Sequence, residues 1–261
     1  MLRITGSKLL IVSIFFILTL SQPILSFAVN NPIRFSQAQP IILNGLKDAS
    51  YVAIGTGYDT YKMHEHINFS NSTDTSLIYL DPEIAATGII GEFALGYGKY
   101  LGKSKRAYAG VEVFVSGSGA DGDFEVERPL PKEFDYEINK DVIDTDVIVN
   151  GSLGLYFVPA FLINKYSKLY FKLGYSWSLV SIDETTRVCR EFDCVAVEVD
   201  QDKVNRGFTY GVGLESAFYD EFSLRAELIN ANYTAFYTDS ATKVDPSSFR
   251  YLIGLVYHFK L

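Results

Sequence analysis

The sequence has few of the residues that hold metals or form cross-links: two cysteines and three histidines among 261 residues. Both cysteines, Cys189 and Cys194, lie in the run CREFDC. A zinc site at these cysteines would need two more ligands, and neither a further cysteine nor a histidine lies close to them in sequence. A close pair in an exported protein favours a disulfide. We therefore predict a Cys189–Cys194 disulfide, no metal site and no cofactor.

Long apolar runs are also scarce, and the only one lies at the amino terminus. Arg3 and Lys8 precede the apolar run from Leu9 to Leu20, and Ser26-Phe27-Ala28 has the small-x-small form of a cleavage site. An uncleaved anchor is the alternative, but the run is shorter than the roughly 20 residues that a membrane-spanning helix needs. Residues 1–28 are therefore predicted to be a signal peptide.

Positive charge is the third shortage, with 23 Lys and Arg against 31 Asp and Glu and a net charge of −8. Removal of residues 1–28 takes away Arg3 and Lys8 and no acid, which leaves −8 − 2 = −10. A mature protein this acidic is a poor ligand for nucleic acid. Nucleic-acid binding is therefore excluded as a function.

Alternation of apolar and small or polar residues is abundant from residue 50 onwards. In the segment from Leu169 to Leu179, the odd positions are large and apolar and most even positions are Gly, Ser or Lys. In the segment from Asp146 to Val158, Val147, Val149 and Leu153 are predicted to share the apolar face. A period of two indicates β-strands. The eight segments are Tyr51–Tyr58, Gly88–Gly98, Ala107–Ser116, Asp146–Val158, Leu169–Leu179, Phe208–Phe218, Phe222–Ile229 and Tyr251–Leu261.

The connections between these segments alternate between short turns and acidic stretches of very roughly 17 to 29 residues, which is typical of outer-membrane barrels. A soluble eight-stranded barrel is the alternative, but the apolar faces carry too many large rings for a small interior. We predict an all-β fold, an eight-stranded antiparallel transmembrane β-barrel over residues 50–261, with short periplasmic turns and four long exterior loops. Residues 29–49 are predicted to form an N-terminal periplasmic arm. Ten strands would result if TTRVC (185–189) and VAVEV (195–199) formed a further hairpin.

Charged residues on the small-residue faces are expected to point into the lumen. Because buried charges must pair, Lys172 and Arg225 are predicted to form a salt-bridge cluster with Glu112, Glu215 and Glu227. Two interpretations remain open: a static plug, or a gate that exchanges partners and opens a narrow water path. The full set on these faces is Glu92, Glu112, Lys172, Glu215, Arg225, Glu227, Arg250 and His258.

The eight segments, the alternating connections and the last strand together resemble the small eight-stranded Gram-negative outer-membrane barrels of the OmpA transmembrane-domain and opacity-protein type. The run ending in Gly254, Tyr257, Phe259 and Leu261 is similar to the assembly signal of that family. The resemblance implies a bacterial outer-membrane location, contact with lipid and lipopolysaccharide, and recognition by the barrel assembly machinery. It also implies an interior salt-bridge cluster.

The sequence leaves the function between two hypotheses. The first is a structural or surface-interaction role, such as adhesion or host contact, carried by the long loops. The second is a small passive channel of the porin type. No enzyme is predicted, because the only histidine on a barrel wall, His258, points inward, away from lipid substrates. The pair His64 and His66 is interpreted as part of a polar loop, with transient zinc binding as the alternative. Rings in the loops either pack within the loops or contact a partner: Phe124, Phe134, Tyr136, Phe192, Phe236 and Tyr237.

Overall fold

The computed structural model describes residues 49–70, 77–80, 83–102, 106–128, 141–190, 193–219, 221–237 and 243–259, and all its regular elements there are strands. Among these residues, no helix is long and apolar enough to cross a membrane. The predicted signal peptide and nearly all of the predicted arm lie outside the described residues. The strands are β1 (Ala49–Ser70), β2 (Leu77–Leu80), β3 (Glu83–Leu101), β4 (Ala107–Arg128), β5 (Asp141–Leu162), β6 (Ser167–Arg190), β7 (Asp193–Ala217), β8 (Phe222–Tyr233), β9 (Phe236–Tyr237) and β10 (Lys243–His258).

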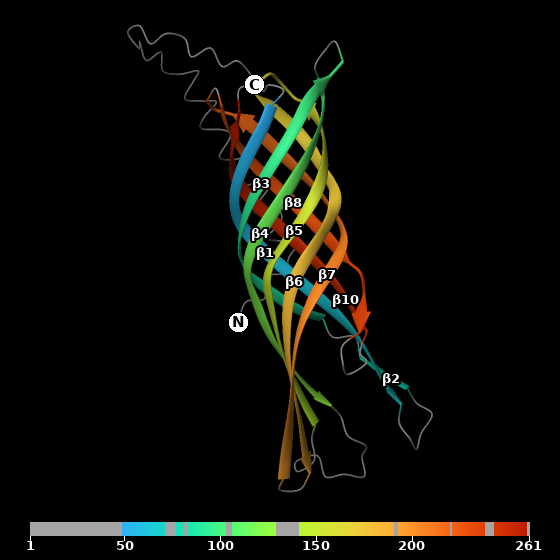
Figure 1. Cartoon of the computed structure of the whole chain (residues 1–261). Helices are drawn as coiled ribbons and strands as arrows, with labels where there is room; N and C mark the ends of the chain where they lie inside the picture. Colours follow the sequence, from blue (N-terminus) through green and yellow to red (C-terminus); the bar gives the residue numbers. More distant parts are fainter. Residues whose placement is uncertain are drawn as a thin grey trace, which may run out of the picture. The chain divides into compact units, whose positions relative to one another are not determined.

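The strands close into a barrel (Figure 1). Sheet order is β2-β1-β3-β4-β5-β6-β7-β8-β10-β9, and an additional antiparallel pairing joins β1 to β10. The two short strands β2 and β9 lie outside the ring, which leaves 10 − 2 = 8 strands in it. The closing pairing runs from Tyr51 opposite His258 to His66 opposite Lys243. The predicted eight-stranded antiparallel barrel is therefore confirmed, and its closure gives every strand two neighbours within the ring.

Short turns join the strands at one end of the barrel, which we call the periplasmic end after the sequence prediction; the opposite end is called the exterior end. Gly102, which follows β3, has φ +74°, a conformation in which glycine is favoured because it has no side chain. Between β5 and β6, Asn164 Oδ1 accepts hydrogen bonds from the N–H groups of Tyr166 and Ser167, at 2.8 and 2.9 Å. Side chains of Asn commonly fix turns in this way. These contacts stabilise the turn between β5 and β6.

At the exterior end the ring strands run further than the sequence pattern predicted. Their lengths range from 12 residues in β8 to 25 in β7, whereas the alternating segments span about 8 to 13 residues. The stretches TTRVC and VAVEV are strands, but they continue β6 and β7 instead of adding a new hairpin to the ring. Cys189 stands opposite Cys194 in the backbone register. The side chains of both cysteines lie outside the described residues, so the disulfide stays a prediction.

A β-bulge in β5 corrects one predicted face. The pairing of β5 with β6 shifts between Val149 and Gly151, so the two faces exchange parity across Asn150. Val147 and Val149 therefore point into the barrel and are buried, whereas Leu153 faces outward. Asn150 lies outside, where its Nδ2 donates to Ser181 Oγ at 2.9 Å. The prediction that these two valines share the face of Leu153 was wrong because a strict period of two takes no account of an extra residue.

The outer wall of the periplasmic part of the barrel is an apolar belt. Exposed fractions there reach 59% for Val111, 53% for Leu155 and 59% for Ile253. No water-soluble surface needs so many large exposed apolar side chains, whereas a lipid-facing wall does. The belt includes Ile54, Ile89, Phe93, Leu95, Val111, Val113, Val115, Leu153, Leu155, Phe157, Leu169, Phe171, Leu173, Leu179, Phe208, Val212, Leu214, Leu224, Ile253 and Leu255.

Candidate functional site

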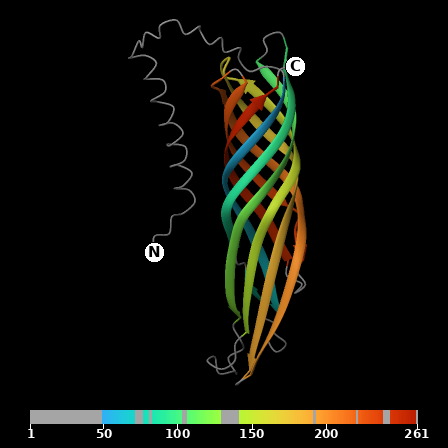
Figure 2. The same cartoon turned by 60° about the vertical axis from the view of Figure 1, so that its left-hand side comes forward.

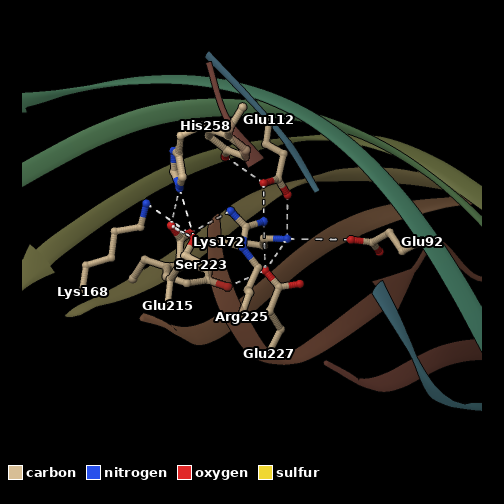
Figure 3. A network of polar contacts seen from close by, with 11 residues as sticks. Glu92, Glu112, Lys168, Lys172, Glu215, Ser223, Arg225, Glu227 and His258 are labelled. Carbon is tan, nitrogen blue, oxygen red and sulfur yellow. Dashed lines mark hydrogen bonds and ion pairs between the residues drawn. The ribbon is translucent and has the colours of Figure 1, made fainter. Parts of the chain in front are cut away.

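The lumen of the periplasmic half holds a network of buried charges, which we call the ionic layer (Figure 3). Its central carboxylate is Glu112 on β4, which is 1% exposed. Lys172 Nζ on β6 lies 2.6 Å from Glu112 Oε1, and Arg225 Nη1 on β8 lies 2.7 Å from Glu112 Oε2. The layer comprises Glu92, Glu112, Lys168, Lys172, Glu215, Arg225, Glu227 and His258.

Two further carboxylates complete the predicted cluster. Glu227 Oε1 lies 2.7 Å from Lys172 Nζ and 3.5 Å from Arg225 Nη1. Glu215 Oε2 lies 3.2 Å from Arg225 Nη2. The structure therefore brings together all five residues that the sequence proposed for a lumen cluster. They come from β4, β6, β7 and β8, so the network ties opposite parts of the barrel wall across its interior.

Lys168 belongs to the ionic layer but was not in the predicted set. Its Nζ lies 3.1 Å from Glu215 Oε2, and the residue is 2% exposed. It stands two residues before Tyr170 and four before Lys172, on the same face of β6. The period of two places Lys168 on the lumen face, but the predicted segment began one residue later, at Leu169, and so left it out.

Tyrosine rings line the ionic layer and supply hydrogen bonds to it. Tyr51 OH donates to Glu112 Oε2 at 2.8 Å, and Tyr170 OH donates to Glu227 Oε1 at 2.6 Å. The guanidinium carbon of Arg225 lies 5.1 Å from the Tyr51 ring centre and 5.2 Å from that of Tyr170. These are cation–π distances, so the cation is stabilised by rings as well as by carboxylates.

Glycine makes room for these rings. A Cβ at Gly96 would stand 2.1 Å from Cζ of Tyr51, and a Cβ at Gly213 would stand 2.2 Å from Cζ of Tyr170. Each ring therefore lies flat over a neighbouring strand at a place where no side chain rises. At these two positions glycine is therefore required by the packing of the rings.

Ser223, His258 and Glu215 meet at the periplasmic end of the layer and have the residue types of a catalytic triad. Ser223 Oγ lies 3.1 Å from His258 Nε2, and the same Nε2 lies 2.9 Å from Glu215 Oε1. A triad uses one ring nitrogen for the nucleophile and the other for the acid. Here both contacts fall on Nε2, and Ser223 Oγ also donates to Glu215 Oε1 at 2.8 Å. This geometry does not activate the serine.

A second, contrasting layer fills the lumen towards the exterior. We call it the apolar layer, and all its members are buried, among them Met63 and Val149 at 1% exposure. Phe124 and Phe236 pack against it. These two loop-predicted rings therefore serve packing. The layer comprises Tyr61, Met63, Ile84, Ala86, Ala120, Val147, Val149, Val180, Ile182, Ala231, Tyr233 and Val244.

Buried polar groups occupy the level between the two layers. Asp59 accepts hydrogen bonds from Ser118 Oγ at 3.1 Å and Ser248 Oγ at 2.8 Å. Arg250, which the sequence placed in the lumen, is fully buried, and its Nη2 lies 3.4 Å from Tyr233 OH. The described side chains thus fill the lumen at three successive levels.

The remaining candidates, the two histidines near the end of β1 and the rings predicted in loops, do not come together in one site. His64 lies on β1, not in a loop; it is exposed, and its Nε2 is 3.8 Å from Glu83 Oε2. The side chain of His66 lies outside the described residues. Within the part of the chain that the structure describes, no three His, Cys, Asp or Glu side chains are arranged to hold a metal ion. Of the remaining loop rings, Tyr237 is 66% exposed, and Phe134, Tyr136 and Phe192 lie outside the described residues.

A sequence profile of the outer membrane protein beta-barrel domain matches residues 38–259. The chain belongs to this family. Its place is accordingly the bacterial outer membrane. The apolar belt suits contact with lipid, and the periplasmic position of the short turns stays a prediction. A search of curated proteins gave no match.

Solved structures similar to this outer-membrane barrel carry different descriptions. Ail, the attachment invasion locus protein of Yersinia pestis, is 16% identical; the match covers 81% of this chain and 99% of Ail, with a TM-score of 0.33. The outer membrane protein OprG of Pseudomonas aeruginosa is 15% identical over 84% and 100% of the two chains, with a TM-score of 0.44. The outer membrane protease OmpT of Escherichia coli is 10% identical over 82% and 98%, with a TM-score of 0.39.

The predicted assembly signal of this outer-membrane barrel lies at the closing strand. Gly254 stands opposite Gly55 of β1, and a Cβ there would be 2.7 Å from Ile54 O. The rings of Tyr257 and Phe259 meet edge to face, with centres 5.2 Å apart. Leu261 lies outside the described residues. Recognition by the assembly machinery stays a prediction.

Proposed function

We propose that this outer-membrane barrel acts by contact between its exterior part and a partner at the cell surface, without catalysis. One observation carries the proposal: four neighbouring strands continue beyond the ring as a sheet. Pairing of β3 with β4 ends at Thr87 opposite Asp121, and pairing of β7 with β8 ends at Gly207 opposite Tyr233. Beyond these points β4, β5, β6 and β7 still pair with one another (Figures 1 and 2). We call this part, residues 122–128, 141–147, 182–190 and 193–203, the projecting sheet.

The projecting sheet has continuous backbone pairing between neighbouring strands, which a set of irregular loops lacks. Its strands are held by backbone pairing as far as Arg128 opposite Asp141 and Arg190 opposite Asp193. A partner that binds such a surface does not have to order it first, which lowers the entropic cost of binding. Surface contact is therefore the function that this architecture favours.

The channel hypothesis receives no support from the described lumen. An ion would have to pass the ionic layer, whose Glu112 and Lys172 are 1% exposed, and then the apolar layer, whose Ala120 is 0% exposed. Buried pairs are costly to separate and apolar constrictions exclude water. We expect refolded protein in planar bilayers to give no discrete conductance steps; regular steps would restore the channel hypothesis.

Shortening of the β6–β7 hairpin tests the proposal. Ile182 stands opposite Gln201, so an Asn-Gly turn that joins these two positions removes the outer part of the hairpin in register. We expect the variant to keep its heat-modifiable mobility on gels but to lose adhesion of cells that display it to cultured host cells and matrix-coated surfaces.

A matched control shortens a different exterior hairpin. Asn68 stands opposite Tyr79 at the tip formed by β1 and β2, and a turn that joins them leaves the projecting sheet intact. Adhesion should persist in this control. If cells bearing the shortened β6–β7 hairpin adhered as well as cells bearing the natural protein, the surface-contact proposal would be wrong.

A further inference from the structure

The outer part of β7 is a sheet edge. Every residue of β7 from Asp193 to Ser216 has a partner on β6, but pairing with β8 begins only at Gly207. The next contact outward is the hydrogen bond from Thr234 N–H to Arg206 O, at 2.8 Å. Among the described residues, the stretch of β7 from 195 to 205 pairs on one side only. Such an edge offers a row of backbone donors and acceptors to a further strand.

The direction of individual backbone groups follows from this hydrogen bond. In an antiparallel sheet the N–H and C=O of one residue point to the same neighbour, and successive residues alternate. Because Arg206 O points towards β8, the even-numbered residues point their backbone groups to the open side. The register with β6 and with β8 runs without a shift along β7. Glu198, Asp200 and Asp202 therefore present their N–H and C=O groups at the free edge.

The two faces beside this edge differ in chemistry. The side chains of Glu198, Asp200 and Asp202 are exposed on the face that continues the outer wall of the barrel. On the other face, Val195 is 63% exposed and Val197 is 53% exposed. A strand added here would place alternate side chains against acids and against valines.

A row of acids on this face crosses all four strands of the projecting sheet, and further out Arg187 of β6 lies on the same face, 3.1 Å from Asp144. Asp123 of β4 stands opposite Asp146 of β5, Asp146 opposite Asp183 of β6, and Asp183 opposite Asp200 of β7. All four side chains are exposed. A hydrogen bond that the protonated Asp183 carboxyl donates to Asp200, together with the charges of neighbouring acids, raises the pKa of Asp183. Like charges directly opposite in a sheet repel, so positive charge from outside would relieve this row.

We propose that the free edge of β7 binds an extended segment of a partner protein by antiparallel strand addition, and that this segment alternates basic with apolar side chains. The inference rests on the proposed surface-contact function and names the chemistry of its partner. Backbone groups of Glu198, Asp200 and Asp202 supply the hydrogen bonds, the acidic face takes the basic side chains, and Val195 and Val197 take the apolar ones.

A second copy of this chain is the occupant that the charges disfavour. The opposite edge of the projecting sheet belongs to β4, whose outward residues Asp121, Asp123 and Glu125 are also exposed acids. Pairing of β7 with either β7 or β4 of another copy would bring carboxylates together. Edge charges of this kind prevent self-association and leave the edge open to a strand of opposite charge.

The test uses the full-length refolded protein in detergent micelles and a labelled ten-residue peptide of alternating Lys and Val. Binding is followed by fluorescence anisotropy. We expect saturable binding, and affinity about tenfold lower or worse for a Glu-Val peptide. In the proposed geometry the lysine N–H groups face β7 and the valine N–H groups face away. N-methylation of the lysines should therefore abolish binding, whereas N-methylation of the valines should preserve it.

Two variants separate edge pairing from attraction to a charged surface. Asp200→Ser removes one carboxylate and keeps the edge N–H, whereas Asp200→Pro removes both. We expect the proline variant to bind about tenfold more weakly than the serine variant, because proline lacks the donor and blocks the edge. Equal binding by the two variants, with folding shown by heat-modifiable mobility, would mean adsorption to an acidic surface only and would overturn the proposal. So would failure of the natural protein to bind the Lys-Val peptide, or its self-association through β7.

The two failures are distinguishable. If shortening of the β6–β7 hairpin abolishes cell adhesion but the Lys-Val peptide does not bind, the surface-contact function stands and strand addition to β7 is wrong. If the hairpin is dispensable for adhesion, the surface-contact function itself is wrong, whatever the peptide does.

Discussion

The periplasmic and exterior parts of the barrel are built from the same strands but differ in polarity. In the periplasmic part, the outer wall carries the apolar belt, and the interior carries the ionic layer packed among buried apolar side chains such as Phe114 and Val256. In the exterior part, the interior carries the apolar layer and the outer wall carries acids such as Asp146, Asp183 and Asp202. One part is arranged for lipid surroundings and the other for water, as in a soluble protein.

The change of polarity is visible along single strands. On β6, Leu179 faces outward and is 47% exposed, whereas the next apolar residue, Val180, faces inward and is 1% exposed. From there on Ile182 is inside, and Ser181 and Asp183 are outside. On β5 the change coincides with the bulge at Asn150. The level of these residues therefore marks the exterior boundary of the hydrocarbon region.

The largest difference between the two parts should appear when a charge in the ionic layer loses its partner. Glu112→Ala leaves Lys172 and Arg225 buried without their shared carboxylate. We expect the free energy of unfolding to fall by about 3–5 kcal/mol, as for other broken buried ion pairs. Urea-induced unfolding in lipid vesicles, followed by tryptophan fluorescence, measures it.

A compensated variant serves as the control for this change. Glu112→Leu combined with Arg225→Met removes one charge of each sign, and Glu215 keeps its contact with Lys168 at 3.1 Å. Replacement of both partners by apolar groups is often close to neutral. The double variant should recover most of the lost stability; a cost as large as that of Glu112→Ala would show that pairing is not what stabilises this layer.

The apolar layer should respond to loss of volume, as the core of a soluble protein does. Ile182 is 4% exposed within that layer, and Ile182→Ala should lower the free energy of unfolding by about 2–4 kcal/mol. The neighbouring Ser181 faces outward, and Ser181→Ala should cost about 1 kcal/mol or less. Similar costs for the two changes in urea unfolding would contradict the assignment of Ile182 to a packed interior.

The sequence predicted the ring, its closing strand and five members of the ionic layer because alternation is strict where lipid lies outside. It did not predict the apolar layer, since in that part of the barrel the alternation continues but the apolar side chains point inward and the polar ones outward. The misassigned Val147 and Val149 lie at this exchange. A single extra residue, Asn150, turns their side chains to the inside of the barrel. The adjacent apolar residues Leu179 and Val180 break the alternation, and they were the signal in the sequence for the change of polarity on β6.

Strand lengths were also beyond the sequence pattern. The sequence predicted loops for the acidic stretches around Asp123 and Asp200 because their polar residues suit water, yet these stretches pair as strands. Polarity reports which solvent a face meets and does not by itself report whether the backbone is paired.

The smallest effect concerns the acidic row on the outer wall of the exterior part. The pKa of Asp183 is raised by its hydrogen bond with Asp200 and by nearby carboxylates. A raised folded-state pKa gives stability that is present below the unfolded pKa and is lost as pH rises through the folded pKa. Asp183→Asn should therefore raise the free energy of unfolding at neutral pH by about 0.5 kcal/mol or less, which shows as a higher unfolding midpoint. The gain should disappear in acid, and a gain that grew as pH fell would contradict this account.

The depth of β6 in the membrane tests most directly whether the change of polarity marks the exterior boundary. Nitroxide labels placed singly at the outward positions Phe171, Tyr175, Leu179, Ser181 and Asp183 report collisions with oxygen, which concentrates in lipid, or with a water-soluble nickel complex. We predict oxygen-dominated collisions up to Leu179 and nickel-dominated collisions from Ser181 outward. Lipid exposure that continued through Asp183, or water that reached Tyr175, would contradict the account.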